Sequence, residues 1–501
     1  MTRRLPSWVR LLLLGGGLVL TLTACQSEST GVVDPALQAE IERYDPFGVL
    51  NVFPDPQLRM AVFDRIRPAP SDTTPAGFPR TYLTLEDVRG ITDLRAPQQQ
   101  IHSLEGMQVC SALQTLELGN NPIRDLTPLA DLAHLTRLDI SRCQVQDLRP
   151  LRSIRTLRHL AASHNRITDI RDLSTLVQLE VLDLSGNGLS YASTVKALVN
   201  LRHLVLRNNE LEYLPGLSQH TRLHSLDVLH NRLVRLPELA GCDSLTRVLA
   251  GDNNISGISG LIDLPALRSV SLGNNRITTI SGLSNLPELR ELALRGNPLT
   301  TVTGMEHLPH LVDLDLAYTG VQDLDFLRRF PQLRQLRLWG IPVPDPAFLK
   351  AFPQLEYLDL RATGLQELEF LTGENFPHLT NVALDGNGLT SLEAMGALPT
   401  LERLGVKENQ LTSLDGITKF PQLSQLSADH NQIRQLAAVQ HMDSLHILSL
   451  THNAITDLTP VLASPGMREW GSLRLYGNPL SDYAIREQIP QLRARGVYVH
   501  F

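Results

Sequence analysis

Aliphatic residues return every 22 residues along most of the chain. Thirteen of them keep one register from Ile91 to Leu355, and the register shifts once, by two residues, before Leu379. A fixed period of this length predicts a solenoid, in which each repeat buries its apolar face only against its neighbours. The column consists of Ile91, Leu113, Leu135, Leu157, Leu179, Leu201, Leu223, Leu245, Leu267, Leu289, Leu311, Leu333, Leu355, Leu379, Leu401, Leu423, Leu445 and, at its end, Trp470.

Within each repeat the apolar positions change their spacing. If the column residue is position 1, apolar residues also occupy positions 4 and 6, and then 11, 14, 17 and 20. The spacing of two is typical of a short strand, and the later spacing of three is typical of a 3₁₀-like turn. We therefore expect a strand, a corner and a tight helical return in each repeat. The strands should form one parallel sheet on the inner side of a curve.

Asparagine is the preferred residue at position 9. An amide side chain both donates and accepts hydrogen bonds, so a buried column of amides can satisfy the backbone groups left unpaired at the corners. We expect these asparagines to be structural and not catalytic. The column comprises Asn121, Asn165, Asn187, Asn209, Asn231, Asn253, Asn275, Asn297, Asn387, Asn409, Asn431, Asn453 and Asn478.

The pattern resembles that of the leucine-rich repeat family, and its 22-residue form with Asn-x-Ile-x-x-Leu is similar to the bacterial internalin-like group. The segments at residues 113–123 and 445–455 carry the resemblance, which extends over residues 91–480. It implies an α/β solenoid: a right-handed horseshoe of about 18 repeats, with a parallel concave β-sheet and a convex side of 3₁₀ helices and turns. Family members bind other macromolecules on the concave sheet, but their ligands differ too much for one to be inferred.

Both ends of the solenoid need a cover, and the sequence contains a candidate for each. In the N-terminal cap, residues 51–90, Asp55 and Pro56 predict a helix start, and Thr84 with Asp87 predicts a second one. In the C-terminal cap, residues 481–501, Ser481 predicts the start of another helix. That helix should carry Ile485 and Ile489 and be followed by a strand around Val497 and Val499.

The first residues have the pattern of an export signal. A basic start is followed by an apolar run of thirteen residues, 11–23, which is too short to span a bilayer as a stable helix. The run ends in Leu22-Thr23-Ala24-Cys25, which resembles the bacterial lipobox. The resemblance implies a signal peptide at 1–24, a lipid on Cys25 and a tether at 25–50. An ordinary signal peptide with an incidental cysteine is the alternative. Gln26 after the cysteine fits transport to an outer membrane, where the host has one.

Length, charge and cysteines limit the class of protein. The chain of 501 residues should form one elongated domain, because a stack of repeats grows without enlarging its core. The net charge of -7 is spread along the chain and leaves no basic surface for nucleic acid. Cys110 and Cys242 share one repeat position, six repeats or about 30 Å apart, which is beyond disulfide reach. We expect both to be core residues, as we do Cys143, without disulfides.

One stretch of the predicted concave face differs from the rest. Positions 3, 5 and 7 of each strand point away from the core, and in most repeats they are small or mildly polar. The exception concentrates Trp, Tyr and Arg, the residue types that dominate protein interfaces. It coincides with Thr319, Ile341 and Thr363, which interrupt the asparagine column; tolerated drift is the alternative explanation. The candidate binding residues are Glu291, Arg295, Asp313, Asp315, Tyr318, Arg337, Trp339, Tyr357, Asp359 and Arg361.

The sequence offers no catalytic arrangement. His159, Asp183 and His203 fall on adjacent strands roughly 5 to 10 Å apart without convergence, so we expect no metal there and no cofactor. We therefore expect a monomeric, non-enzymatic envelope protein, anchored in a membrane by its N-terminal lipid, that binds another protein on its concave face. The alternative is an envelope structural protein that holds glycan or peptidoglycan through the same aromatic and arginine side chains.

Overall fold

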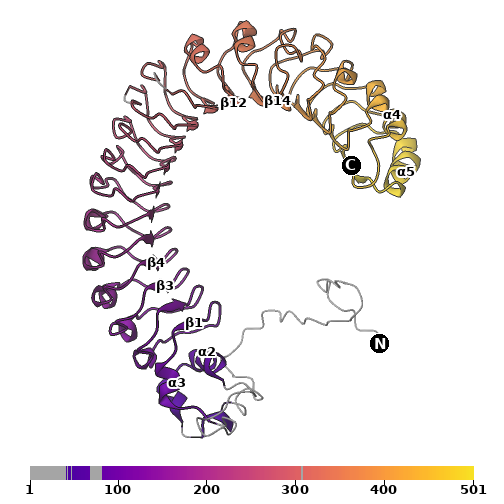
Figure 1. Cartoon of the computed structure of the whole chain (residues 1–501). Helices are drawn as coiled ribbons and strands as arrows, with labels where there is room; N and C mark the ends of the chain where they lie inside the picture. The colour runs from indigo at the N-terminus through magenta and orange to yellow at the C-terminus, as the bar shows by residue number, and fades with distance from the viewer. Residues whose placement is uncertain (1–40, 42, 47, 68–81, 282, 306–307) are drawn as a thin grey trace, which may run out of the picture.

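Short parallel strands form one continuous sheet along the inner side of an open arc (Figure 1). The computed structural model describes the chain except residues 1–40, 42, 47, 68–81, 282 and 306–307. Among the described residues the sheet has 19 strands, and neighbouring strands pair in register one repeat apart, as Leu292 does with Leu314. This confirms the predicted horseshoe. Cys25 and the export signal lie outside the described residues.

Each strand has three residues. The strands are β1 (Asp93–Arg95), β2 (Thr115–Glu117), β3 (Arg137–Asp139), β4 (His159–Ala161), β5 (Val181–Asp183), β6 (His203–Val205), β7 (Ser225–Asp227), β8 (Arg247–Leu249), β9 (Ser269–Ser271), β10 (Glu291–Ala293), β11 (Asp313–Asp315), β12 (Gln335–Arg337), β13 (Tyr357–Asp359), β14 (Asn381–Ala383), β15 (Arg403–Gly405), β16 (Gln425–Ser427), β17 (Ile447–Ser449), β18 (Ser472–Arg474) and β19 (Tyr498–His500).

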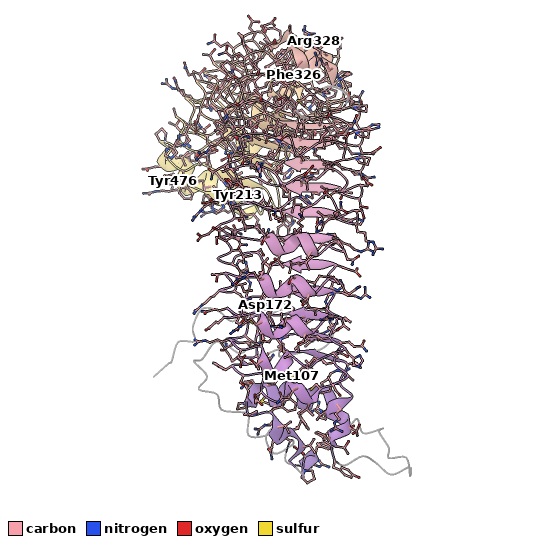
Figure 2. All side chains as sticks on the ribbon, turned by 90° about the vertical axis from the view of Figure 1, so that its left-hand side faces the viewer. Met107, Asp172, Tyr213, Phe326, Arg328 and Tyr476 are labelled. Carbon is pink, nitrogen blue, oxygen red and sulfur yellow. The ribbon has the colours of Figure 1, made fainter. Side chains whose placement is uncertain are left out.

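Helical returns cover the convex side, which faces the viewer in Figure 2. The 3₁₀ helices are η1 (Val49–Val52), η2 (Met107–Val109), η3 (Thr127–Leu129), η4 (Arg149–Ser153), η5 (Arg171–Thr175), η6 (Ser193–Ala197), η7 (Asp325–Arg329), η8 (Pro346–Ala351), η9 (Ile417–Lys419) and η10 (Ala437–His441). Between β6 and β11 the returns are turns, joined in places by isolated bridges such as Ile262 with Ser284. The expected helical return is thus confirmed for only part of the arc.

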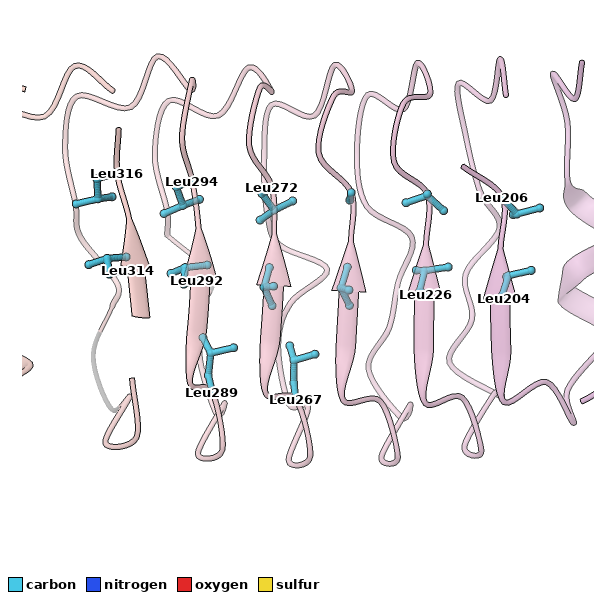
Figure 3. Close-up of a cluster of buried hydrophobic side chains, with 14 of the residues drawn as sticks. Leu204, Leu206, Leu226, Leu267, Leu272, Leu289, Leu292, Leu294, Leu314 and Leu316 are labelled. Atoms are coloured by element: carbon cyan, nitrogen blue, oxygen red, sulfur yellow. The ribbon is translucent and has the colours of Figure 1, made fainter. Parts of the chain in front are cut away.

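Leucines fill the space between the sheet and the returns. Figure 3 shows three of their rows, which run from repeat to repeat at positions 1, 4 and 6. Leu267, Leu292 and Leu294 represent the three rows, and each is at most 1% exposed. Burial of such a side chain contributes about 1.5 to 3 kcal/mol. The core is therefore a long strip of nearly identical layers, and no layer lies deeper than another.

The asparagine column closes the corners as predicted. Asn253 is typical: its Oδ1 accepts a hydrogen bond from the Leu233 amide of the preceding repeat at 2.9 Å. Its Nδ2 donates to the Val228 and Ala250 carbonyls, of the preceding repeat and of its own, at 2.9 and 3.2 Å. One buried amide thus joins two successive repeats.

A second column, at position 8, shares a backbone conformation instead of a chemistry. In all eighteen repeats this residue has a positive φ, whether it is glycine, as in Gly296 (φ 69°), or another residue, as in His430 (φ 56°) or Tyr318 (φ 56°). The left-handed residue turns the chain out of the strand, and it favours Gly, Asn and Asp. Because its side chains differ so much, this column does not stand out in the sequence.

The caps close both ends. In the helix α2 (Pro56–Ile66), Asp55 accepts from the Gln57 and Leu58 amides, and α3 (Leu85–Arg89) begins with the Thr84–Asp87 capping box. At the other end, the α-helix α4 (Thr459–Ala463) replaces a 3₁₀ return, and the π-helical turn η11 (Ala484–Gln488) leads into α5 (Ile489–Ala494). Each helix among the described residues is too short or too polar to cross a membrane.

Three details differ from expectation. Ile41 and Leu50 belong to the hydrophobic core, so the N-terminal cap begins within the stretch that we assigned to the tether. Trp470 keeps the register of the leucine column but is 72% exposed, because the last strand is covered by the terminal helices and Met467 fills the core nearby. Ile485 is also partly exposed, whereas Ile489 is buried.

The three cysteines of the described chain are free and buried, as core residues. Burial raises the pKa of the Cys110 thiol to about 12 and that of Cys242 to about 11. Cys143 occupies an asparagine position, and its thiol lies 3.6 Å from the Leu118 carbonyl oxygen. A thiol held in this protonated form is unreactive at neutral pH.

Candidate partner-binding site on the concave sheet

All ten predicted binding residues lie on four adjacent strands, β10 to β13, and on the corners that follow them. Glu291, Asp313 and Tyr357 share one row across the sheet, with Gln335 between the last two. The next row on the same face contains Asp315, Arg337 and Asp359. The structure therefore brings the set together on one surface, as the 22-residue register requires. We call this surface the aromatic–arginine patch.

Two aromatic rings and two guanidinium groups form a continuous stack along the patch. The rings of Tyr318 and Trp339 are 4.6 Å apart, with their planes at 48°. The Arg361 guanidinium lies over the Trp339 ring at 3.8 Å, and Arg295 lies at 5.6 Å from the Tyr318 ring on the other side. Each such cation–π contact contributes about 0.5 to 1 kcal/mol at an exposed site. The stack holds four side chains from four successive repeats in place.

Glycine makes room for this stack. Gly340 has a φ of 76°, and a Cβ atom on it would lie 3.1 Å from Cδ1 of Tyr318. The tyrosine ring therefore rests over the glycine backbone of the next repeat. Tyr318 itself remains 47% exposed, so the outer part of its ring is available for contact.

Two arginines of the patch are already paired with carboxylates. Arg337 donates to Asp313 at 2.5 Å and to Gln335 at 2.6 Å, and it lies 5.0 Å from the Tyr357 ring. Arg361 makes a two-pronged ion pair with the buried Asp359, at 2.8 and 2.5 Å. Such fork-shaped pairs fix the plane of the guanidinium. These arginines offer a partner a fixed shape more than a free charge.

The acidic side chains are held in a partly dehydrated environment. Burial raises the pKa of Asp313 in spite of the attraction of Arg337, and it raises the pKa of Asp315 in the same way. Burial also raises the pKa of the Tyr357 hydroxyl. The hydrogen bond to Asp359 raises the pKa of Arg361, which keeps its positive charge. Glu291 lies at the exposed edge and accepts from Ser269 at 2.8 Å.

The interrupted asparagine column leaves no defect behind the patch. Thr319 and Thr363 donate to the carbonyls of Leu316 and Leu360, at 2.8 and 2.9 Å. Ile341 is completely buried, and its own amide bonds to the Leu338 carbonyl. Substitution at position 9 is thus compensated within each corner. The interruption by itself is no evidence for a binding site, and the case for one depends on the surface side chains.

The histidine group that the sequence suggested does not converge. His159 and His203 are separated by a whole strand, β5, and His203 Nδ1 shares a hydrogen bond with Ser225 Oγ at 2.8 Å. The Asp183 carboxylate accepts from Ser185. Burial lowers the pKa of both histidines. Within the described part of the chain, no three His, Cys, Asp or Glu side chains are grouped so as to hold a metal.

Sequence reasoning missed a hollow beside the patch. It lies over β14, β15 and β16, where position 5 is occupied by Ala383, Gly405 and Ser427 in place of the larger residues of the patch. The sequence signal was therefore a run of three small residues in one column. Tyr357 borders both surfaces.

Comparisons with known proteins agree with this architecture. The family model "Leucine Rich repeats (2 copies)" matches residues 111–153, 155–195, 243–285 and 265–310. A leucine-rich repeat protein of Leptospira interrogans has a similar structure, with a TM-score of 0.58 at 22% identity over 83% of this chain and 97% of that one. The functional domain of InlJ from Listeria monocytogenes gives 0.53 at 20% identity, over 85% and 80%.

A third similar structure is that of TLR13 in a complex with the RNA ssRNA13. It gives a TM-score of 0.54 at 17% identity, over 84% of this chain and 66% of that one. No curated protein matches the chain. At these identities the similar structures establish the fold alone.

Proposed function

This chain is a leucine-rich repeat protein, and we propose that it is a lipid-anchored scaffold of the cell envelope that binds another protein on its concave sheet. The observation that carries the proposal is the stack of Arg295, Tyr318, Trp339 and Arg361 across four repeats. Trp, Tyr and Arg account for most of the affinity in protein interfaces. Here they are held by one another before any partner arrives, so binding costs little ordering.

The charge of the patch favours a protein over a nucleic acid. Four carboxylates (Glu291, Asp313, Asp315 and Asp359) accompany three arginines, and the chain as a whole carries a net charge of -7. Affinity for a phosphate backbone depends mainly on unpaired basic side chains. Two of the three arginines are instead neutralised by carboxylates of the patch. The RNA in the complex of TLR13 is therefore no guide to the ligand of this chain.

Photo-crosslinking tests the proposal. We would place a photoreactive phenylalanine derivative at Ala293, next to the patch on β10, or at Ala161, the same repeat position on β4. The crosslinker at 293 should yield one major protein adduct in intact cells, and the crosslinker at 161 should not. In the 293 protein, Trp339→Ala should remove the adduct, whereas Trp470→Ala, which truncates an exposed tryptophan outside the patch, should leave it.

Other outcomes separate the rival explanations. Adducts of equal yield at both positions would contradict a localised protein-binding patch. If isolated cell-wall sacculi retain the wild-type protein but not the Trp339→Ala variant, the ligand is glycan or peptidoglycan.

The anchor needs its own experiment. Cys25 follows a short apolar run and the Leu-Thr-Ala sequence, and acylation at several positions supplies enough hydrocarbon for stable membrane attachment. A Cys25→Ala variant should be recovered in the soluble fraction, and metabolic labelling with a radioactive fatty acid should no longer mark the protein. Retention of the label in this variant would disprove lipidation at Cys25.

A further inference from the structure

The hollow beside the patch has a volume of about 240 Å³ and opens on the concave face. Its floor is formed by β14 to β16, near the top of the arc in Figure 1. Gly405 is the centre of this floor, and a Cβ atom on it would approach the Asp385 carboxylate to 3.0 Å. A small residue is therefore needed there to keep the hollow open.

One wall of the hollow is a row of polar side chains that have no partner. Asn381, Arg403 and Gln425 occupy position 3 on three adjacent strands and pair with one another in the sheet register. Within the described chain, none of the three side chains makes a hydrogen bond or an ion pair with another residue. Together they present one guanidinium group between two amide groups. Such a row of N–H donors matches the geometry of a carboxylate.

The opposite wall is already balanced in charge. The Asp385 carboxylate accepts from the Lys407 amide at 2.7 Å, and the Lys407 ammonium pairs with Asp429 at 3.4 Å. Asp429 is further held by Ser449 and Thr451. Positions 3 and 7 of one strand are about 13 Å apart, so Arg403 lies away from these acids. It is the uncompensated charge of the hollow.

We propose that the hollow receives an acidic side chain, Asp or Glu, of the same protein that binds the aromatic–arginine patch. The carboxylate would bind Arg403 between the amides of Asn381 and Gln425. This inference rests on the proposed function, because the hollow adjoins the patch at Tyr357. Arg403 lies three strands beyond that of Trp339, or about 15 Å along the sheet. A single bound surface can cover both.

Selection from a displayed library of random peptides tests this inference on the purified full-length protein. Peptides that the wild type enriches should contain Asp or Glu, and Arg403→Gln should weaken their binding roughly 10- to 100-fold, the usual effect of losing a hydrogen bond to a charged group. Arg247→Gln is the matched control, since Arg247 is an exposed arginine at position 3 of β8 that likewise makes no ion pair with described residues. That variant should bind normally.

A selected peptide and its analogue with Glu→Gln or Asp→Asn then complete a double-mutant cycle. If the acid binds Arg403, the two changes together should cost no more than either one alone. Additive losses, peptides enriched in Lys or Arg, or the absence of any enriched peptide would overturn the inference. Peptides that depend on Trp339 but not on Arg403 would leave the proposed function intact and refute only the acidic contact.

Discussion

At the scale of single residues, two columns make each corner possible, and they differ in how far chemistry constrains them. The position 9 amide must reach both a carbonyl and an amide of neighbouring chain segments, so asparagine recurs there and the sequence reveals the column. The position 8 residue needs only a left-handed backbone, which His430 and Tyr318 adopt as well as glycine. Its column is therefore invisible before the backbone is known.

Adjacent asparagines permit a direct test of the first column. Asn253 is buried and bridges two repeats, whereas Asn254 is half-buried and its side chain makes no hydrogen bond with described residues. Asn253→Ala should lower the free energy of local opening in these repeats by about 2 kcal/mol or more, because buried backbone groups lose their partners. Asn254→Ala should change it little. Hydrogen exchange of the Leu233 amide measures the difference, and equal effects would contradict a bridging role.

Asp315 gives a prediction with a defined pH dependence. Its pKa is raised in the folded chain by burial, so its ionised form opposes folding at pH values above that raised pKa. Asp315→Asn keeps an acceptor for the Ala317 amide and should stabilise the protein at pH 7. The advantage should shrink as the pH falls through the raised pKa and vanish below the ordinary value of 3.8. Urea denaturation at several pH values tests this, and a constant difference would contradict it.

At the scale of elements, the spacing of apolar residues was sufficient for the strands but not for the returns. A strand needs alternation over three residues and a neighbour in register, and both repeat faithfully. The returns between β6 and β11 are turns because tight 3₁₀ and open turns bury the same columns at positions 14, 17 and 20. Trp470 shows the opposite limit. It keeps the period, but the terminal helices change its surroundings and leave it exposed.

The N-terminal cap is joined to the solenoid through one carboxylate. Asp55 caps α2 with one oxygen, and the other accepts from the His102 and Ser103 amides at 2.8 and 3.1 Å. Asp55→Ala should destabilise this end by about 2 kcal/mol, because it removes a helix cap and the acceptor for the first repeat. Limited proteolysis should then begin at α2. Asp64→Ala, an exposed change on the same helix, should leave the cleavage pattern unchanged.

At the scale of the whole molecule, the sequence located the patch but not its internal pairing. Alternate residues of a strand share a face, and a constant period places them beside one another, so the ten residues had to meet. Which carboxylate pairs with Arg337, and that Arg361 stacks on Trp339, depend on side-chain conformations that no periodicity encodes. The same limit concealed the hollow, whose shape depends on what the small residues leave open.

Removal of single repeats tests this division between scaffold and site. Deletion of residues 201–222 removes the repeat of β6 and joins two compatible edges, so the chain should still fold and still form its crosslink at Ala293. Deletion of residues 311–332 removes the same length but takes Tyr318 and Asp313 out of the patch. This second chain should fold equally well, since stability in a solenoid depends on contacts between neighbouring repeats. It should lose the adduct. Circular dichroism of both chains would confirm folding, and an unchanged adduct in the second would show that the partner binds elsewhere on the arc.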